Sequence, residues 1–149
     1  MMKKLLPPIL LFLFVILMPL VCWLTAAPHF INYPFNLLGL VAVVLGFALA
    51  KSGSTIFAQE ETNIMTFNKP DKLVEIGVFQ YTRNPMYLGF VIALLGYAVL
   101  IGGAPVSFLF VIAFLLIADR WYIRFEEKMM EQTFGNAYLR YRGRVRRWL

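Results

Sequence analysis

The chain has 149 residues, of which 60% are hydrophobic and only 15% are charged. Soluble domains average about 45–50% apolar and about 25% charged residues, so this composition excludes an ordinary soluble domain. The apolar residues are concentrated in separate segments. We therefore expect an all-α membrane protein in which residues 1–149 form one domain.

Four apolar segments are long enough to be considered as membrane-spanning helices, at residues 5–24, 35–50, 86–101 and 104–118. Some are shorter than the about 20 residues that a spanning helix prefers, but flanking aromatic and small polar residues can extend them. Pro19 should kink the first helix, and the last can continue as a helix beyond the bilayer. The sequence therefore predicts about four transmembrane helices.

The first segment has a second interpretation. Lys3, Lys4, the apolar run and the small residues at 25–27 are also typical of a secretory signal peptide. Cleavage would leave an odd number of spanning helices and would spoil the asymmetry of the basic residues described next. We therefore expect the segment to be retained as a helix.

The basic residues predict the orientation. All 14 Lys and Arg residues lie in the N-terminal tail, between residues 51 and 84, or from Arg120 onward. The connections at 25–34 and 102–103 contain none. With four spans every basic residue falls on one side, which the positive-inside rule makes cytosolic, and we expect a bacterial inner membrane. The net charge of +6 then indicates topology and contact with anionic lipid headgroups, and not nucleic-acid binding.

Two glycine pairs predict how the central helices pack. Gly39 and Gly46 lie seven residues apart in the second segment, and Gly89 and Gly96 have the same spacing in the third. Each pair falls on one helix face, where glycine lets two backbones approach closely in lipid. The turn at residues 102–105 should join the third and fourth helices as an antiparallel hairpin.

The segment at 51–84 is the longest connection. Connections of this length are usually either functional or disordered. Its apolar residues, from Phe57 to Phe79, are too many for a disordered segment. We expect a cytosolic loop that folds back on the bilayer surface as a lid.

Asn84 and Pro85 predict the start of the third helix, because Asn is a good N-cap and Pro fits the first helical position. The free N–H groups at that end can bind a carboxylate or phosphate, with Arg83 just before them and Tyr87 one turn later. Simple capping, with a snorkelling Arg and an interfacial Tyr, explains the same residues. The spacing alone leaves both interpretations open.

Glu126 is the more informative acid. If the fourth helix continues through Thr133 at 100° per residue, Glu126 lies on an apolar face and needs a partner there. That partner is either a basic residue of the loop or a cationic ligand. A separate, solvated face should gather the other charged residues: Arg120, Arg124, Glu127, Lys128 and Glu131.

Two motif blocks stand out in the second half of the chain. The first contains Gly77, Phe79, Arg83, Asn84, Pro85 and Tyr87. The second contains Glu126, Glu127, Phe134, Gly135, Tyr138 and Tyr141. Both blocks, in this order and at this separation, resemble the superfamily of isoprenylcysteine carboxyl methyltransferases and phospholipid methyltransferases. The resemblance covers about residues 71–141, nearly half of the chain.

The resemblance implies a membrane enzyme that takes S-adenosylmethionine from the cytosol and a lipophilic acceptor from the bilayer. Arg83 would bind the cofactor carboxylate, and Arg124, or failing it Arg120, would orient an anionic acceptor. Phe79 and Tyr87 would hold the adenine or the sulfonium by their aromatic faces. Carried over residue by residue, the cofactor contacts would be Asp71, Lys72, Leu73, Val74, Phe79, Asn84, Pro85, Met86, Tyr87 and Glu126.

The chain departs from the eukaryotic prenylcysteine enzymes of this superfamily at three positions. Those enzymes usually have His at the position of Asn84, often Tyr at that of Phe79, and a substrate-side Arg where this chain has Tyr122. The cofactor site is therefore better supported than a prenylcysteine substrate. We expect no metal, because there is no His/Cys cluster.

Three functions remain as hypotheses. The first is methyl transfer to a carboxylate or thiolate, neither of which needs a general base. The second is N-methylation of an amine phospholipid, and the third is a non-catalytic membrane scaffold. In all three we expect an amphipathic C-terminal helix on the headgroups, placed there by Arg140, Arg142, Arg144, Arg146 and Arg147.

Overall fold

The structure is a computed structural model that describes residues 6–62 and 71–149, and helices dominate this part of the chain. This confirms the predicted all-α class. The longer helices are α1 (Pro7–Leu24), α2 (Leu38–Gln59), α3 (Pro85–Leu100), α4 (Pro105–Ile117), α5 (Arg124–Phe134) and α6 (Asn136–Arg144). Two short 3₁₀ helices, η1 (Phe35–Leu37) and η2 (Gly77–Gln80), and a π-helical segment, η3 (Ala118–Ile123), complete the set.

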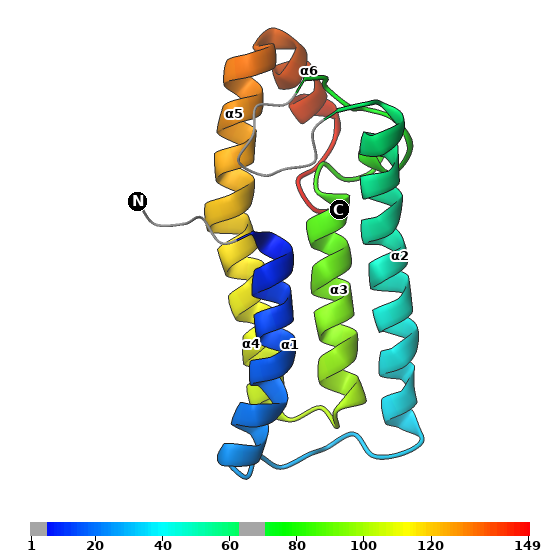
Figure 1. Cartoon of the computed structure of the whole chain (residues 1–149), viewed down its shortest axis with the longest axis vertical. Coiled ribbons are helices and arrows are strands. Elements are labelled where there is room, and N and C mark those ends of the chain that lie inside the picture. Colours follow the sequence, from blue (N-terminus) through cyan, green and yellow to red (C-terminus); the bar gives the residue numbers. More distant parts are fainter. Residues whose placement is uncertain (1–5, 63–70) are drawn as a thin grey trace.

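The first four helices form an antiparallel bundle (Figure 1). In the view of Figure 1, α1 and α3 run downward and α2 and α4 run upward, so that α5, α6 and the C-terminus lie at the upper end. Among the described residues, three helices are long and apolar enough to cross a membrane: Pro7–Leu24, Phe35–Gln59 and Pro105–Phe134. The helix Pro85–Leu100 is apolar but shorter. The chain is thus a multi-pass membrane protein.

The predicted glycine seam between α2 and α3 is confirmed. A Cβ atom added to Gly46 would lie 2.5 Å from the carbonyl oxygen of Gly89, and one added to Gly96 would lie 2.6 Å from the carbonyl oxygen of Gly39. Real Cβ atoms do not approach backbone atoms this closely. The two helix backbones therefore touch along this seam, which holds the start of α3 beside the last turns of α2.

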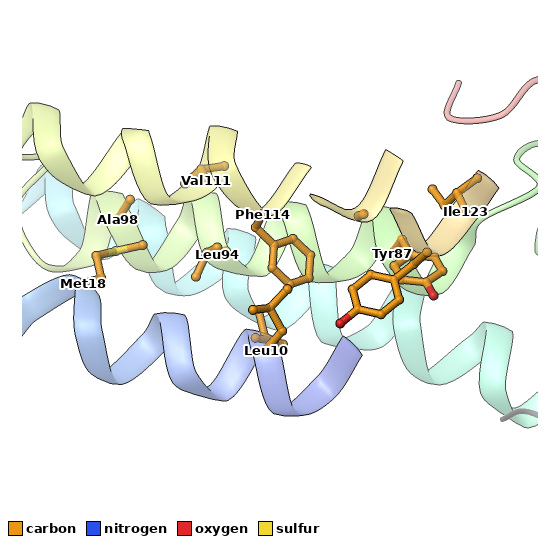
Figure 2. Packing of buried hydrophobic residues seen from close by; sticks show 11 residues of the cluster. Leu10, Met18, Tyr87, Leu94, Ala98, Val111, Phe114 and Ile123 are labelled. Atoms are coloured by element: carbon orange, nitrogen blue, oxygen red, sulfur yellow. The ribbon is translucent and has the colours of Figure 1, made fainter. Parts of the chain in front are cut away.

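The other face of α3 packs against α1 and α4 through large side chains. Figure 2 shows Leu10 of α1 and Phe114 of α4 in contact, with Leu94 of α3 beside them. Leu94 is fully buried and Phe114 is 1% exposed. Phe14 packs edge-on against Phe110, with 5.5 Å between ring centroids. This cluster fixes α3 and α4 side by side, so the site residues at their upper ends have a rigid base.

The predicted start of the long connection is wrong. We expected the connection to begin at residue 51, but the second helix is extended by its flanking residues: α2 continues to Gln59 and takes up the first part of the expected loop. Ser52 and Ser54 donate their hydroxyl hydrogens to carbonyl oxygens three residues earlier, at 2.8 and 3.1 Å, so the polar residues are satisfied inside the helix. The predicted lid lies partly outside the described residues, at 63–70.

The predicted regular helix through Thr133 is also wrong in its register. Between α4 and α5 the chain forms the π-helical segment η3, which contains more residues per turn than an α-helix. The faces of α5 are therefore rotated relative to those of α4. Glu127 does not lie on a solvated face as expected: its side chain is only 12% exposed and is paired with Arg83.

The predicted orientation can be tested by cysteine labelling. We expect a cysteine at Gln59 to react with a membrane-impermeant maleimide only after cells are opened, because the basic residues should keep the upper end of the bundle cytosolic. A cysteine at Asn32, in the connection at the opposite end, should react in intact cells. Both variants need a Cys22→Ala background, although Cys22 is buried. Labelling of position 59 from outside would overturn the orientation.

Candidate functional site

The two sequence motifs meet around one cavity at the upper end of the bundle. The residues before and within the first turn of α3 form one wall, and α5 and α6 form the other. Of the residues implied by the resemblance, the following line the cavity: Val74, Phe79, Arg83, Asn84, Pro85, Met86, Tyr87 and Glu126. They are joined by Phe57, Glu127, Met130, Tyr138 and Tyr141, which were not predicted as contacts.

Four predicted site residues lie elsewhere. Asp71 and Lys72 are exposed, and the backbone N–H of Lys72 donates to the hydroxyl of Thr62 at 3.2 Å. Leu73 is half-buried but does not line this cavity. Arg124 is exposed on α5 and also lies outside the lining. From the segment 71–74, only Val74 reaches the cavity wall.

Glu126 lies at the junction of the two walls. The hydroxyl of Tyr87 on α3 donates to its carboxylate at 2.7 Å. The ring of Tyr87 in turn stacks on Tyr122 of η3, with 6.1 Å between centroids and 21° between planes. One partner of the acid is therefore a phenol, a group that our two sequence-based alternatives did not include.

Glu127 holds the two walls together. Its Oε1 accepts from Arg83 at 2.6 Å and from Nε of Arg147 at 3.1 Å, while its Oε2 accepts from the same Arg147 at 2.5 Å. The Arg83 side chain is 9% exposed, so this ion pair is largely buried. Such charge-assisted contacts are the strong class of hydrogen bonds. They fix the angle between the start of α3 and α5.

Residues 145–149, here called the C-terminal strap, return from α6 and cross beside the start of α3 (Figure 1). The carbonyl oxygen of Arg147 accepts from the amide of Asn84 at 2.9 Å and from the hydroxyl of Thr82 at 3.2 Å. Pro85 begins α3 as predicted, but the Asn84 side chain makes no capping bond. Asn84 is thus the N-cap residue by position, as predicted, but its side-chain amide binds the strap and its side-chain oxygen does not cap the helix.

The strap also corrects the prediction for the basic tail. Arg140, Arg142, Arg144 and Arg146 are exposed, but Arg147 turns inward to pair with Glu127 and with Asp119 at 3.1 Å. These hydrogen bonds, first of all that with Glu127, raise the pKa of Arg147 above its usual value. One of the five arginines expected on the lipid headgroups is thus part of the site.

Sequence reasoning missed the acid that receives this arginine. Asp119 lies in η3 and accepts from Arg147 and from the indole N–H of Trp148 at 3.0 Å. A carboxylate at the end of an apolar helix needs a partner. The same argument that singled out Glu126 therefore applies to Asp119. Its partners, Arg147 and Trp148, are adjacent in the C-terminal tail, and this pair of side-chain N–H donors was the sequence feature that could have indicated them.

Two phenols close the cavity from α6. Gly135 has a φ of 51°, a conformation that glycine adopts readily, and turns the chain from α5 into α6. The hydroxyl of Tyr141 then donates to the carbonyl oxygen of Phe79 at 2.8 Å. Burial, together with the charge of Glu127, raises the pKa of Tyr138 to about 12. Tyr138 is therefore a neutral hydrogen-bonding group near neutral pH.

The sequence is similar to those of known methyltransferases. The sequence profile of the phospholipid methyltransferase family matches residues 35–137. Protein-S-isoprenylcysteine O-methyltransferase B of Arabidopsis thaliana is 33% identical over 112 residues, which make up 72% of this chain and 55% of that protein. A probable enzyme of the same name from Oryza sativa subsp. indica is 31% identical over 121 residues, 78% of this chain and 59% of that one.

A solved structure has a similar fold. The eukaryotic intramembrane Ras methyltransferase ICMT, an isoprenylcysteine carboxyl methyltransferase, superposes with a TM-score of 0.65 at 24% identity, over 76% of this chain and 41% of that one. The chain spans about half the length of the curated relatives that it matches. The matched profile covers more than half of this chain and includes the first motif block and the second block as far as Gly135. This chain belongs to the phospholipid methyltransferase family.

Proposed function

We propose that the protein is an S-adenosylmethionine-dependent methyltransferase that acts on a lipophilic acceptor at the cytosolic face of the membrane. The observation that carries the proposal is the meeting of both motif blocks around one cavity at the end of a membrane-spanning bundle. The relatives named as isoprenylcysteine O-methyltransferases support methyl transfer as the reaction class.

The side chains around the cavity fit the parts of S-adenosylmethionine. The carboxylate of Glu126 suits the ammonium group or the ribose hydroxyls. Nε of Arg83 is buried and has no hydrogen-bond partner among the described residues, so one donor remains for the cofactor carboxylate. The aromatic faces of Phe79 and Tyr87 suit the adenine or the positively charged sulfonium.

The cavity is narrow. Its volume is about 80 Å³, whereas sites for small molecules usually hold about 300–1,000 Å³. The cavity in this form therefore holds only part of a nucleoside-sized molecule, and its walls would have to separate to take in the whole molecule. Closure around the bound cofactor would exclude water from the reacting groups.

Methyl transfer mainly requires the protein to align the methyl donor with the acceptor. S-adenosylmethionine supplies a methyl group on a sulfonium, so an acceptor oxygen or sulfur forms a bond to carbon as the carbon–sulfur bond breaks. A carboxylate acceptor becomes a neutral ester, the leaving sulfur becomes a neutral thioether, and no proton moves. The two walls have to hold donor and acceptor in line, which is where most of the acceleration arises in such displacements.

The acceptor should enter sideways from the bilayer, because the cavity lies between the start of the apolar helix α3 and helix α5, which continues the spanning helix Pro105–Phe134. Arg124 is exposed outside the cavity, so it can orient an anionic acceptor only at the entrance. The exposed arginines of α6 and the strap would hold this entrance at anionic headgroups. Amine phospholipids are the second candidate class of acceptor, favoured by the name of the matching family.

A methyl-transfer assay with a panel of acceptors tests the proposal. Purified protein in lipid nanodiscs would receive S-adenosylmethionine carrying a radioactive methyl group and, in turn, a prenylcysteine, a fatty acid, a lipophilic thiol or phosphatidylethanolamine. We expect label in an ester or a thioether, the ester being released as methanol by mild base.

The outcomes separate the hypotheses. Methylation of phosphatidylethanolamine alone would establish the N-methyltransferase and overturn the ester-forming proposal. If no acceptor is labelled and calorimetry detects no binding of S-adenosylmethionine or S-adenosylhomocysteine, the non-catalytic scaffold should replace both.

A further inference from the structure

The C-terminal strap contacts both walls of the candidate site, the residues before α3 and helix α5. Its backbone is bonded to the residues before α3: the N–H of Arg83 donates to the carbonyl oxygen of Arg146 at 3.0 Å, and the Arg83 guanidinium donates to that of Val145 at 2.6 Å. Its side chains reach α5 through Glu127 and η3 through Asp119. The strap thus contacts segments that are far apart in the sequence.

Charges of alternating sign run across the site as one chain. Arg83 pairs with Glu127, Glu127 pairs with Arg147, and Arg147 pairs with Asp119. Arg147 is the link in the middle, because its guanidinium binds both acids while its carbonyl oxygen binds Asn84. A guanidinium offers its donors in a fixed planar fork, so it fixes directions as well as distances.

Trp148 anchors this link. Its indole N–H donates to the same carboxylate that receives Arg147, and its ring packs against the hydrophobic cluster between α1, α3 and α4. The strap is therefore held from both sides of Arg147. Because the Arg147 side chain is held in this way, the residues bonded to it are kept in one arrangement. Binding sites depend on such supporting residues to keep the ligand-binding side chains in place.

We propose that Arg147 is a positioning residue, which orients Glu127, Arg83 and Asn84 around the cofactor without touching the reacting atoms. This inference rests on the proposed function, because the ligand to be positioned is S-adenosylmethionine. Arg147 acts by binding Glu127 beside Arg83, and Nε of Arg83 is left without a hydrogen-bond partner among the described residues. The specificity of the site for the donor molecule thus depends on a residue outside both motif blocks.

Calorimetry of the full-length protein with S-adenosylmethionine tests the role of Arg147. Arg147→Gln should weaken binding at least about tenfold, since two oriented charge-assisted contacts to Glu127 are lost. Arg147→Lys should recover part of the affinity, because it keeps the charge but not the planar fork. Arg140→Gln removes the same charge from an exposed position on α6 and should bind as the wild type does.

A double variant separates positioning from simple structural support. If Arg147 acts through Glu127, then Glu127→Gln combined with Arg147→Gln should bind no more weakly than the worse single variant, whereas independent effects would add. Thermal unfolding of each variant identifies those that are folded at the temperature of the titration. Arg147→Lys carries the test if Arg147→Gln does not fold.

Each result decides one of the two proposals. A folded Arg147→Gln variant with the affinity of the wild type would overturn the positioning role and leave the proposed function intact. Additive losses in the double variant would also overturn it. A wild-type protein that binds no S-adenosylmethionine would instead overturn the proposed function, and this inference with it.

Discussion

Replacing Gly46 with alanine should lower the free energy of unfolding by about 1–3 kcal/mol, the usual cost of forcing an extra carbon into a packed interface. The new Cβ would lie 2.5 Å from both the carbonyl oxygen of Gly89 and the backbone nitrogen of Ala93. Backbone atoms cannot rotate away as a side chain can, so α2 and α3 would have to separate. This loss should exceed the gain of up to about 1 kcal/mol that alanine brings to a helix.

Gly143→Ala is the matched control. Gly143 lies in α6, and a Cβ there would meet no atom within 4 Å, so this variant should be neutral or slightly more stable. Unfolding of both variants can be followed by circular dichroism in mixed micelles of increasing denaturing detergent. Equal stability of Gly46→Ala and the wild type would mean that the two backbones are not in contact at the seam.

The second large effect is expected at Glu126. Glu126→Gln should weaken the binding of S-adenosylmethionine by about 1.5–3 kcal/mol, the contribution of a hydrogen bond to a charged group. The amide is nearly the same size and can still accept from Tyr87, so the wall should keep its shape while it loses the charge that attracts the cofactor ammonium. Calorimetry at constant ionic strength measures the difference directly.

Glu131→Gln is the appropriate comparison for this variant. Glu131 is an exposed acid on the same helix and contacts Arg142 at 3.4 Å, so its loss should leave the affinity unchanged. On the predicted solvated face, Glu127 would have been a suitable neutral control, but in the structure it is not solvated and cannot serve as one. Its removal would leave Arg83 and Arg147 without their shared partner, at a cost to both stability and binding. Equal losses at Glu126 and Glu131 would exclude a direct contact between Glu126 and the cofactor.

The sequence predicted the parts of the fold that depend on local pattern. The glycine pairs identified the α2–α3 seam, because close backbone contact in lipid requires small residues at a fixed spacing. Hydropathy located the helices but not their ends, since the serines at the end of α2 satisfy their own hydroxyls within the helix. The π-helical segment η3 was missed, because a regular 100° step was assumed from α4 into α5.

The candidate site was predictable as far as the motif blocks reach. Val74, Phe79, the residues 83–87 and Glu126 do meet around one cavity. The partners of Glu127 were not predictable from the periodicity of its own helix, because they come from Arg83 and from the strap, on separate segments. Basic residues near a membrane usually lie on headgroups. We therefore expected Arg147 there as well, and did not predict that its side chain pairs with Glu127.

The π-helical turn at Ala118–Ile123 precedes Glu126 and Glu127 on the same continuous helix. The directions of these two side chains therefore depend on the number of residues in the turn as well as on their identity. Each residue of a helix turns the next by about 100°, so loss of one residue within this turn would swing Glu126 and Glu127 away from α3. The hydropathy of the span would hardly change. We therefore expect natural relatives to keep the number of residues in this turn. Substitutions there should be tolerated more readily than insertions or deletions.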